Sequence, residues 1–186
     1  VAVFFANPVR NRANDVEYVY HQDPNFYYLT GYREPHAVLL IFSEDQKNDE
    51  QTFNEAIFVQ ERNEMAELWT GKRLGVEGVK EKLGFVNVYN CIDFINAEID
   101  FDAYEKVLFF NFQNDVRDSK RNEADLYDLM DTFKTKVGYT SVAERSQAHK
   151  RAYNLIKTTE ITNSANVARV LGRFVEFDPS LKVMRL

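Results

Sequence analysis

Residues 15–42 read DVEYVYHQDPNFYYLTGYREPHAVLLIF and carry the clearest structural signals in this chain. Within this segment, Asp23 can cap a helix whose first position is a proline, where the missing amide hydrogen is no loss. Gly31 stands where a left-handed residue ends a helix, so the order predicts a helix at Pro24–Thr30. Six apolar residues follow at 37–42, which indicates a central strand buried on both faces.

Similar patterns continue on both sides of this segment. Apolar runs predict further buried strands at residues 1–6, 55–60, 85–89 and 106–112. The polar residues 10–14 predict a loop, and the acidic, amide-rich residues 43–54 predict a surface hairpin or loop. Apolar spacing predicts helices at residues 76–83, 91–99 (with Ile92, Ile95 and Ile99 on one side), 122–136, 146–156 and 163–174. Strands that alternate with helices favour an α/β fold with a layered sheet.

Length and composition limit the possible classes of protein. The chain has 186 residues, which suits one domain with a substantial core. Binding to phosphate groups needs a basic face, but the net charge is −6 and the lysines and arginines form no long run. Both observations argue against nucleic acid as a partner. No apolar run approaches the roughly 20 residues of a membrane-spanning helix, which argues against a membrane protein. Cys91 is the only cysteine, so no internal disulfide can form and a cytoplasmic location is favoured. Because Val1 already lies inside an apolar run with no initiator methionine, we expect a fragment of a longer protein.

The residues themselves supply no catalytic or metal-binding pattern. The three histidines do not form a His-Glu-x-x-His motif, and no Gly-x-Ser-x-Gly elbow is present. The glycines at 71, 75 and 78 do not match a phosphate-binding loop. Cys91 is interpreted as a small buried hydrophobic residue, and Asp93, Asp100 and Asp102 as helix caps or solvated carboxylates. His21 and His36 flank part of the opening segment, where local hydrogen bonding is favoured over a ligand contact.

Three segments resemble the N-terminal domain of Xaa-Pro aminopeptidases. Residues 15–42 follow the family's order of Asp-x-x-Tyr, then Gln, then Phe-x-Tyr-x-x-Gly, then Glu-Pro and a buried strand. Residues 67–75, ELWTGKRLG, are similar to the family's Glu-x-Trp-x-Gly-x-Arg-x-Gly turn. Residues 178–186, DPSLKVMRL, look like the segment that leads into the family's catalytic domain. Residues 138–166 depart from the family pattern, so helices expected there rest on spacing alone.

This resemblance implies an α/β fold with a mixed sheet of about six strands and helices on both faces, a ribonuclease H-like motif. Residues 1–186 are then a single accessory N-terminal domain, and the C-terminal domain with the pita-bread fold is absent from the chain. In the family that second domain holds two metal ions, usually manganese, on two aspartates, a histidine and two glutamates. The metals activate the water that attacks the bond before proline.

The expected parent is therefore a metalloaminopeptidase that removes the residue preceding a proline at the second position of a peptide. The chain itself is expected to be inactive, with no catalytic residue, metal ligand or cofactor of its own. Its surface is expected to shape the substrate cleft, sometimes from a neighbouring subunit of a homo-oligomer.

Two positions carry that role over from the family, and three more are weaker candidates. Trp69, on a glycine-rich turn, is expected to form an apolar wall against the substrate proline, with core or turn packing as the alternative. Asp15 is expected to pair with a basic group of the catalytic domain or to orient the cleft, with loop capping as the alternative. Arg12, Tyr28 and Arg73 are further candidates for the cleft rim, with packing or surface solvation as the alternative.

Two other functions share this architecture. The chain could belong to a non-catalytic, protein-binding pseudo-peptidase of the histone-chaperone kind, whose second domain keeps the fold and loses the metal ligands. It could also belong to a creatinase-type hydrolase, which acts on a small guanidino compound without metal. Trp69 and its turn fit the peptidase branch better.

Overall fold

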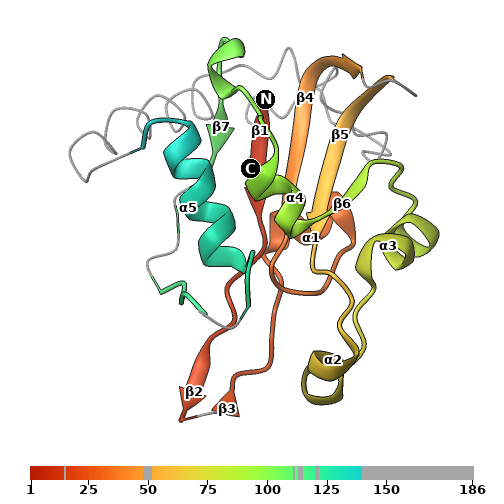
Figure 1. Cartoon of the computed structure of the whole chain (residues 1–186), viewed down its shortest axis with the longest axis vertical. Helices are drawn as coiled ribbons and strands as arrows, with labels where there is room; N and C mark the ends of the chain where they lie inside the picture. The colour runs from red at the N-terminus through yellow and green to blue at the C-terminus, as the bar shows by residue number, and fades with distance from the viewer. Residues whose placement is uncertain (15, 48–51, 111, 113–114, 120–121, 140–186) are drawn as a thin grey trace, which may run out of the picture.

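The fold is built on a five-stranded mixed sheet (Figure 1). The structure is a computed structural model that describes residues 1–139 apart from residues 15, 48–51, 111, 113–114 and 120–121. The strands lie in the order β6 (Val88–Asn90), β5 (Thr52–Val59), β4 (Val38–Lys47), β1 (Ala2–Phe5) and β7 (Leu108–Phe109). β4 pairs antiparallel with β1 and β5, and the edge strands β7 and β6 pair parallel with β1 and β5, respectively. The five strands that the apolar runs predict are thus confirmed, with shifted ends.

β4 explains why its sequence is apolar without a break. Side chains of a strand alternate between the two faces of its sheet. Val38, Leu40 and Phe42 enter one hydrophobic cluster, whereas Leu39 and Ile41 enter a second cluster on the opposite face. Both faces of the central strand are therefore buried, as the run predicts.

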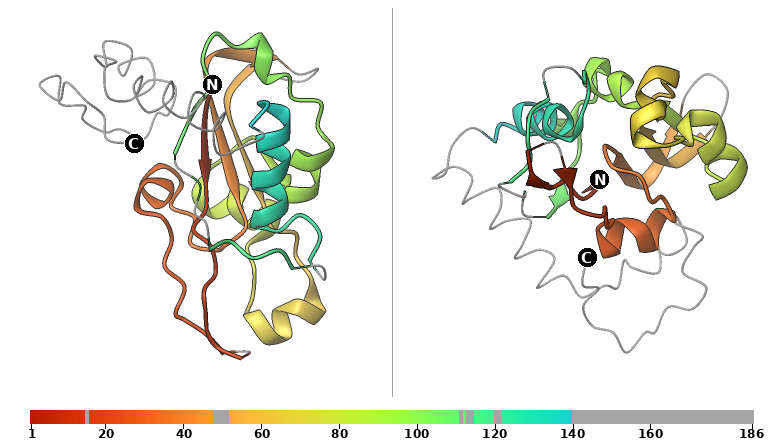
Figure 2. Two further views of the ribbon diagram at one scale, coloured as in Figure 1. Left: turned by 90° about the vertical axis from the view of Figure 1, so that its left-hand side faces the viewer. Right: turned by 90° about the horizontal axis from the view of Figure 1, so that it is seen from below.

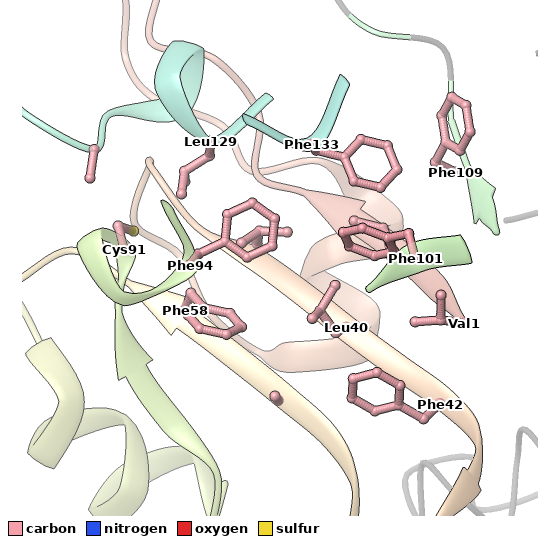
Figure 3. Packing of buried hydrophobic residues seen from close by; sticks show 14 of the residues in the cluster. Val1, Leu40, Phe42, Phe58, Cys91, Phe94, Phe101, Phe109, Leu129 and Phe133 are labelled. Carbon is pink, nitrogen blue, oxygen red and sulfur yellow. The ribbon is translucent and has the colours of Figure 1, made fainter. Parts of the chain in front are cut away.

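Helices cover both faces of the sheet, as expected (Figures 1 and 2). The helices are α1 (Pro24–Thr30), α2 (Glu64–Thr70), α3 (Gly75–Leu83), α4 (Cys91–Asn96) and α5 (Leu126–Lys136), with a 3₁₀ turn, η1, at Phe101–Ala103. One cluster includes Phe94 and Phe133, from α4 and α5, and the other includes Phe26 and Val79, from α1 and α3. Figure 3 shows the first cluster, where the ring centroids of Phe101 and Phe109 lie 5.2 Å from that of Phe133.

α1 forms for the reasons that its sequence gives. The Asp23 carboxylate accepts hydrogen bonds from the backbone N–H groups of Asn25 and Phe26, both at 2.9 Å. Gly31 ends the helix in the left-handed region at φ 67°, and its N–H donates to the carbonyl of Tyr27. The predicted bounds of this helix are confirmed.

One expectation about loops is wrong, and another is confirmed. Residues 10–14 include a strand, β2 (Asn11–Ala13), which pairs antiparallel with β3 (Val16–Glu17). This hairpin is mostly exposed, so its polar composition reflects solvent on its side chains and does not exclude backbone pairing. The surface hairpin expected at residues 43–54 is confirmed, because β4 and β5 continue beyond the buried run as an antiparallel pair in which Lys47 lies opposite Thr52.

The helix expected at 91–99 ends at Asn96 and turns a different face inward. Phe94 is fully buried, whereas Ile92 is exposed; Ile95 and Ile99 are only partly buried against the core. α5 begins at Leu126, four residues later than expected, because Asp125 caps it through the N–H groups of Tyr127 and Asp128. The helices expected at 146–156 and 163–174 lie outside the described residues.

Candidate functional site

A short helix with no fully buried residue projects from one end of the molecule (Figure 1). Residues 61–74, here called the Trp69 arm, contain α2, and none of the seven residues of α2 is buried. Trp69 is 89% exposed, Leu68 76% and Met65 73%. Large apolar side chains grouped on an exposed element mark a surface that contacts a partner or a ligand.

Local signals account for α2, which the apolar spacing did not predict. The Asn63 side chain accepts from the N–H of Ala66 at 3.0 Å, and Gly71 ends the helix with φ 85°. The Arg62 guanidinium binds the Glu67 carboxylate through two hydrogen bonds of 3.1 and 3.0 Å. These bonds to Arg62 lower the pKa of Glu67. Trp69 therefore lies on a short helix and not on a glycine-rich turn, which corrects the expectation.

Gly75, at the base of the arm, is required by both conformation and space. Its φ is +60°, and a Cβ built there would lie 2.6 Å from Cγ of Arg62. Gly84 has a φ of +74° with nothing within 4 Å of such a Cβ, so it is a matched reference. Gly84→Ala is expected to lower the free energy of unfolding by about 1 kcal/mol, the strain of a left-handed alanine.

Gly75→Ala should lose roughly 2 kcal/mol, because Arg62 must also move and release Glu67. Urea unfolding of both variants measures the difference. Equal losses would mean that the close approach to Arg62 does not constrain the arm.

The β2–β3 hairpin projects from the same end of the long axis as α2 (Figures 1 and 2). Val16 is 52% exposed, and the residues that follow the hairpin, Tyr18 and Val19, are 58% and 81% exposed. Arg10 forms an ion pair of 2.6 Å with Asp115. An open cavity of about 330 Å³ lies between the two chain segments that lead into and out of the hairpin, lined by Asn7, Pro8, Arg10, Tyr18, Val19, Tyr20 and His21.

Gln22 connects these two segments to each other and to Glu34, which lies shortly before β4. Its Oε1 accepts from the N–H groups of Asn7 and Asp23 and from the hydroxyl of Tyr20, at 2.8, 2.9 and 2.9 Å. Its Nε2 donates to the carbonyl of Glu34 at 2.9 Å. Burial raises the pKa of Tyr20 and keeps its hydroxyl protonated as a donor. The glutamine of the opening segment is therefore a structural hub, a role that its sequence pattern does not indicate.

The residues interpreted as structural have that role. Cys91 is buried, its thiol donates to the carbonyl of His36 at 3.0 Å, and burial raises the thiol pKa. Asp93 accepts from the N–H of Asn90, and Asp100 caps η1 through the N–H of Asp102. The partner of the His36 imidazole is not local, because its Nδ1 accepts from Leu126, 90 positions away.

The candidate rim residues are distributed over three elements. Trp69 and Arg73 share the arm, and Arg73 is half-buried with its guanidinium donating to the carbonyl of Glu61 at 3.1 Å. Arg12 is exposed on β2. Tyr28 is 64% exposed on α1. Asp15 lies outside the described residues.

Two further findings concern the described residues only. They contain no group of three His, Cys, Asp or Glu side chains that could hold a metal ion. Across the same part of the chain, every helix is too short or too polar to cross a membrane.

Comparison with known proteins gives one family. Residues 1–106 match the family model for the aminopeptidase P N-terminal domain. Xaa-Pro aminopeptidase of Escherichia coli is 45% identical over 84 residues, which cover 45% of this chain and 18% of that protein. Intermediate cleaving peptidase 55 of Schizosaccharomyces pombe is 32% identical over 177 residues, which cover 89% of this chain and 35% of that protein.

A solved structure agrees with the fold. An Escherichia coli aminopeptidase P variant in complex with substrate superimposes with a TM-score of 0.51 at 26% identity, over 78% of this chain and 30% of that chain. The chain thus spans at most about a third of the length of these similar proteins.

Proposed function

The chain belongs to the aminopeptidase P N-terminal domain family, and on that premise we propose that it is the accessory domain of a metal-dependent Xaa-Pro aminopeptidase. The parent would remove the N-terminal residue from peptides that have proline at the second position. The accessory domain would shape the substrate cleft and contribute contacts in a homo-oligomer. It would act in a reducing compartment such as the cytoplasm, where its single buried cysteine stays free.

The observation that carries this proposal is the exposure of Trp69. A tryptophan that is 89% exposed contributes little to the core. Its neighbours Leu68 and Met65 are also apolar and exposed, so Trp69 belongs to a group of exposed apolar side chains. An indole ring offers a large, rigid and apolar face, which suits a wall against a proline ring. We therefore assign Trp69 to the substrate cleft, with Arg73 at the base of the same arm and Arg12 on the neighbouring hairpin as rim residues. Tyr28 and Asp15 remain candidates of the same kind.

We assign the two manganese ions expected from the family to the catalytic domain of the parent. The chain's own part in the reaction is then to position the peptide. An apolar wall and a polar rim restrict how a short peptide can enter, and correct orientation of the scissile bond accounts for a large part of enzymatic rate enhancement.

An assay of the full-length parent tests the proposal. With manganese present, the parent should release the first residue from an Xaa-Pro peptide and leave a matched Xaa-Ala peptide intact. The 186-residue chain alone should release nothing under the same conditions. Release by the chain alone would contradict an accessory role, and an inactive parent that captures histones would favour the pseudo-peptidase.

A further inference from the structure

The position of the Trp69 arm is set at its base. No residue of α2 is fully buried, and α2 contributes no residue to either hydrophobic cluster of the sheet. The arm begins after Gln60, which is 7% exposed and follows β5, and it ends at Leu74, the residue that precedes α3. Arg73 donates to the carbonyl of Glu61, so the two ends of the arm are tied to each other.

Two consecutive residues of the opening segment bind the residue that precedes the arm and the last residue of the arm. Gln60 Nε2 donates to the carbonyl of Pro35 at 2.8 Å. The backbone N–H of Leu74 donates to Oε1 of Glu34, also at 2.8 Å. The Glu34-Pro35 pair is therefore the attachment point of the arm on the body of the domain.

The Glu34 carboxylate is itself held in place. Tyr32, whose side chain is fully buried, donates its hydroxyl to Oε2 of Glu34 at 3.0 Å. The backbone carbonyl of Glu34 accepts from Gln22, the hub that also organises the hairpin side. A carboxylate is a stronger acceptor for a backbone N–H than a neutral group is, so the bond to Leu74 is suited to a fixed joint.

We propose that Glu34 is the positioning residue of the Trp69 arm, holding Leu74 through one carboxylate oxygen while Tyr32 fixes the other. The indole of Trp69 is then held at a fixed distance and angle from the sheet. The proposed contact between this ring and the substrate proline requires such a fixed position. The effect on turnover rests on the proposed function of Trp69, whereas the mechanical effect does not. Glu34 is thus expected to act through Trp69 and not on the substrate directly.

Trp69 is the only tryptophan in the 186-residue chain, so its fluorescence anisotropy decay reports the motion of the arm. In Glu34→Ala the decay should lose most of its slow, whole-domain component. Glu34→Gln should keep that component, because an amide oxygen can still accept from Leu74. Tyr32→Phe keeps the core volume and releases one oxygen of Glu34, so it should give a partial loss.

Asp93→Ala is the matched control, because Asp93 also accepts from a backbone N–H, but on α4. Its Trp69 decay should equal that of the unsubstituted chain. If circular dichroism shows that Glu34→Ala does not fold, the anisotropy decay of Tyr32→Phe provides the test instead. An unchanged slow component in Tyr32→Phe and in any folded Glu34→Ala would overturn the proposal, whatever the activities are.

Kinetics of the full-length parent then separate the two proposals. Glu34→Ala should lower kcat/KM for an Xaa-Pro peptide about tenfold or more, with Glu34→Gln restoring most of it, since small misplacements of binding groups have effects of this size. A mobile Trp69 with unchanged kcat/KM would support the role of Glu34 in holding the arm and contradict the proposed role of Trp69 in the cleft.

Discussion

Trp69→Ala in the full-length parent is expected to lower kcat/KM for Xaa-Pro peptides by between about tenfold and a hundredfold, while the melting temperature changes little. Truncation of an aromatic residue at the centre of a contact has effects of this order. An exposed side chain contributes little to folding, and surface substitutions usually lie within about 0.5 kcal/mol of neutral. The separation of activity from stability is therefore the expected result, measured by steady-state kinetics and thermal unfolding of the same preparations.

Val86→Ala is the control for Trp69→Ala, because Val86 is a 62% exposed apolar residue that lies outside the arm. It should change neither activity nor melting temperature. Trp69→Phe should recover part of the activity, since it keeps an aromatic face in the same place. If activity and melting temperature instead fall together in Trp69→Ala, the indole is a packing residue and the cleft assignment is wrong.

The sheet could be predicted from the sequence because its strands carry their own burial signal. The run from Val38 to Phe42 is apolar on both faces, and the Asp23 cap and Gly31 stop define α1 through bonds between near neighbours. Each of these patterns is complete within about ten residues. A single sequence shows such local patterns directly.

The exposed elements could not be predicted in the same way. The β2–β3 hairpin and α2 present few or no buried side chains, so they lack the apolar periodicity that identifies elements packed on a core. The Asn63 cap and the Gly71 stop are local signals for α2, but no apolar periodicity accompanies them. The glycine-rich pattern after Trp69 favours a turn instead, which is why the expected element differs from the observed one.

The base of the candidate site is a long-range arrangement. Glu34 contacts Leu74 across 40 positions through a backbone N–H, and such a contact has no complementary side chain to reveal it. The only hint was that both partners lie in segments that resemble the same family. The structure joins these segments, so the opening run acts as the scaffold for the arm that carries Trp69.

His36 gives the fold a second long-range joint. It adopts a left-handed conformation with φ 55°, and its Nδ1 accepts from the N–H of Leu126, the first residue of α5, at 2.9 Å. Nδ1 can accept only while it carries no proton, so the folded state needs the neutral imidazole. Its backbone carbonyl accepts from the Cys91 thiol, which ties α4 to the same point.

Acid is therefore expected to weaken the fold through His36. Burial lowers the pKa of His36 to about 4; nearby Asp125 opposes this shift, and Arg73 adds to it. In the unfolded chain the pKa returns to its ordinary value of about 6.5, so between these values the unfolded state binds more protons. The contribution of the neutral His36 to the free energy of unfolding is complete above pH 6.5 and is lost as the pH falls toward 4. The loss in the free energy of unfolding should reach about 3 kcal/mol, at 1.36 kcal/mol for each unit of pKa difference.

His36→Asn isolates this contribution from the titration of the carboxylates. Asparagine tolerates a left-handed backbone, and its amide oxygen can accept from Leu126 without titrating. Urea unfolding at several pH values between 4 and 7 should give a steep decline for the unsubstituted chain and a much flatter one for His36→Asn. The difference between the two curves, and not either curve alone, measures the histidine, because all other groups titrate in both. If the two curves run parallel, the joint between His36 and α5 does not depend on a neutral imidazole.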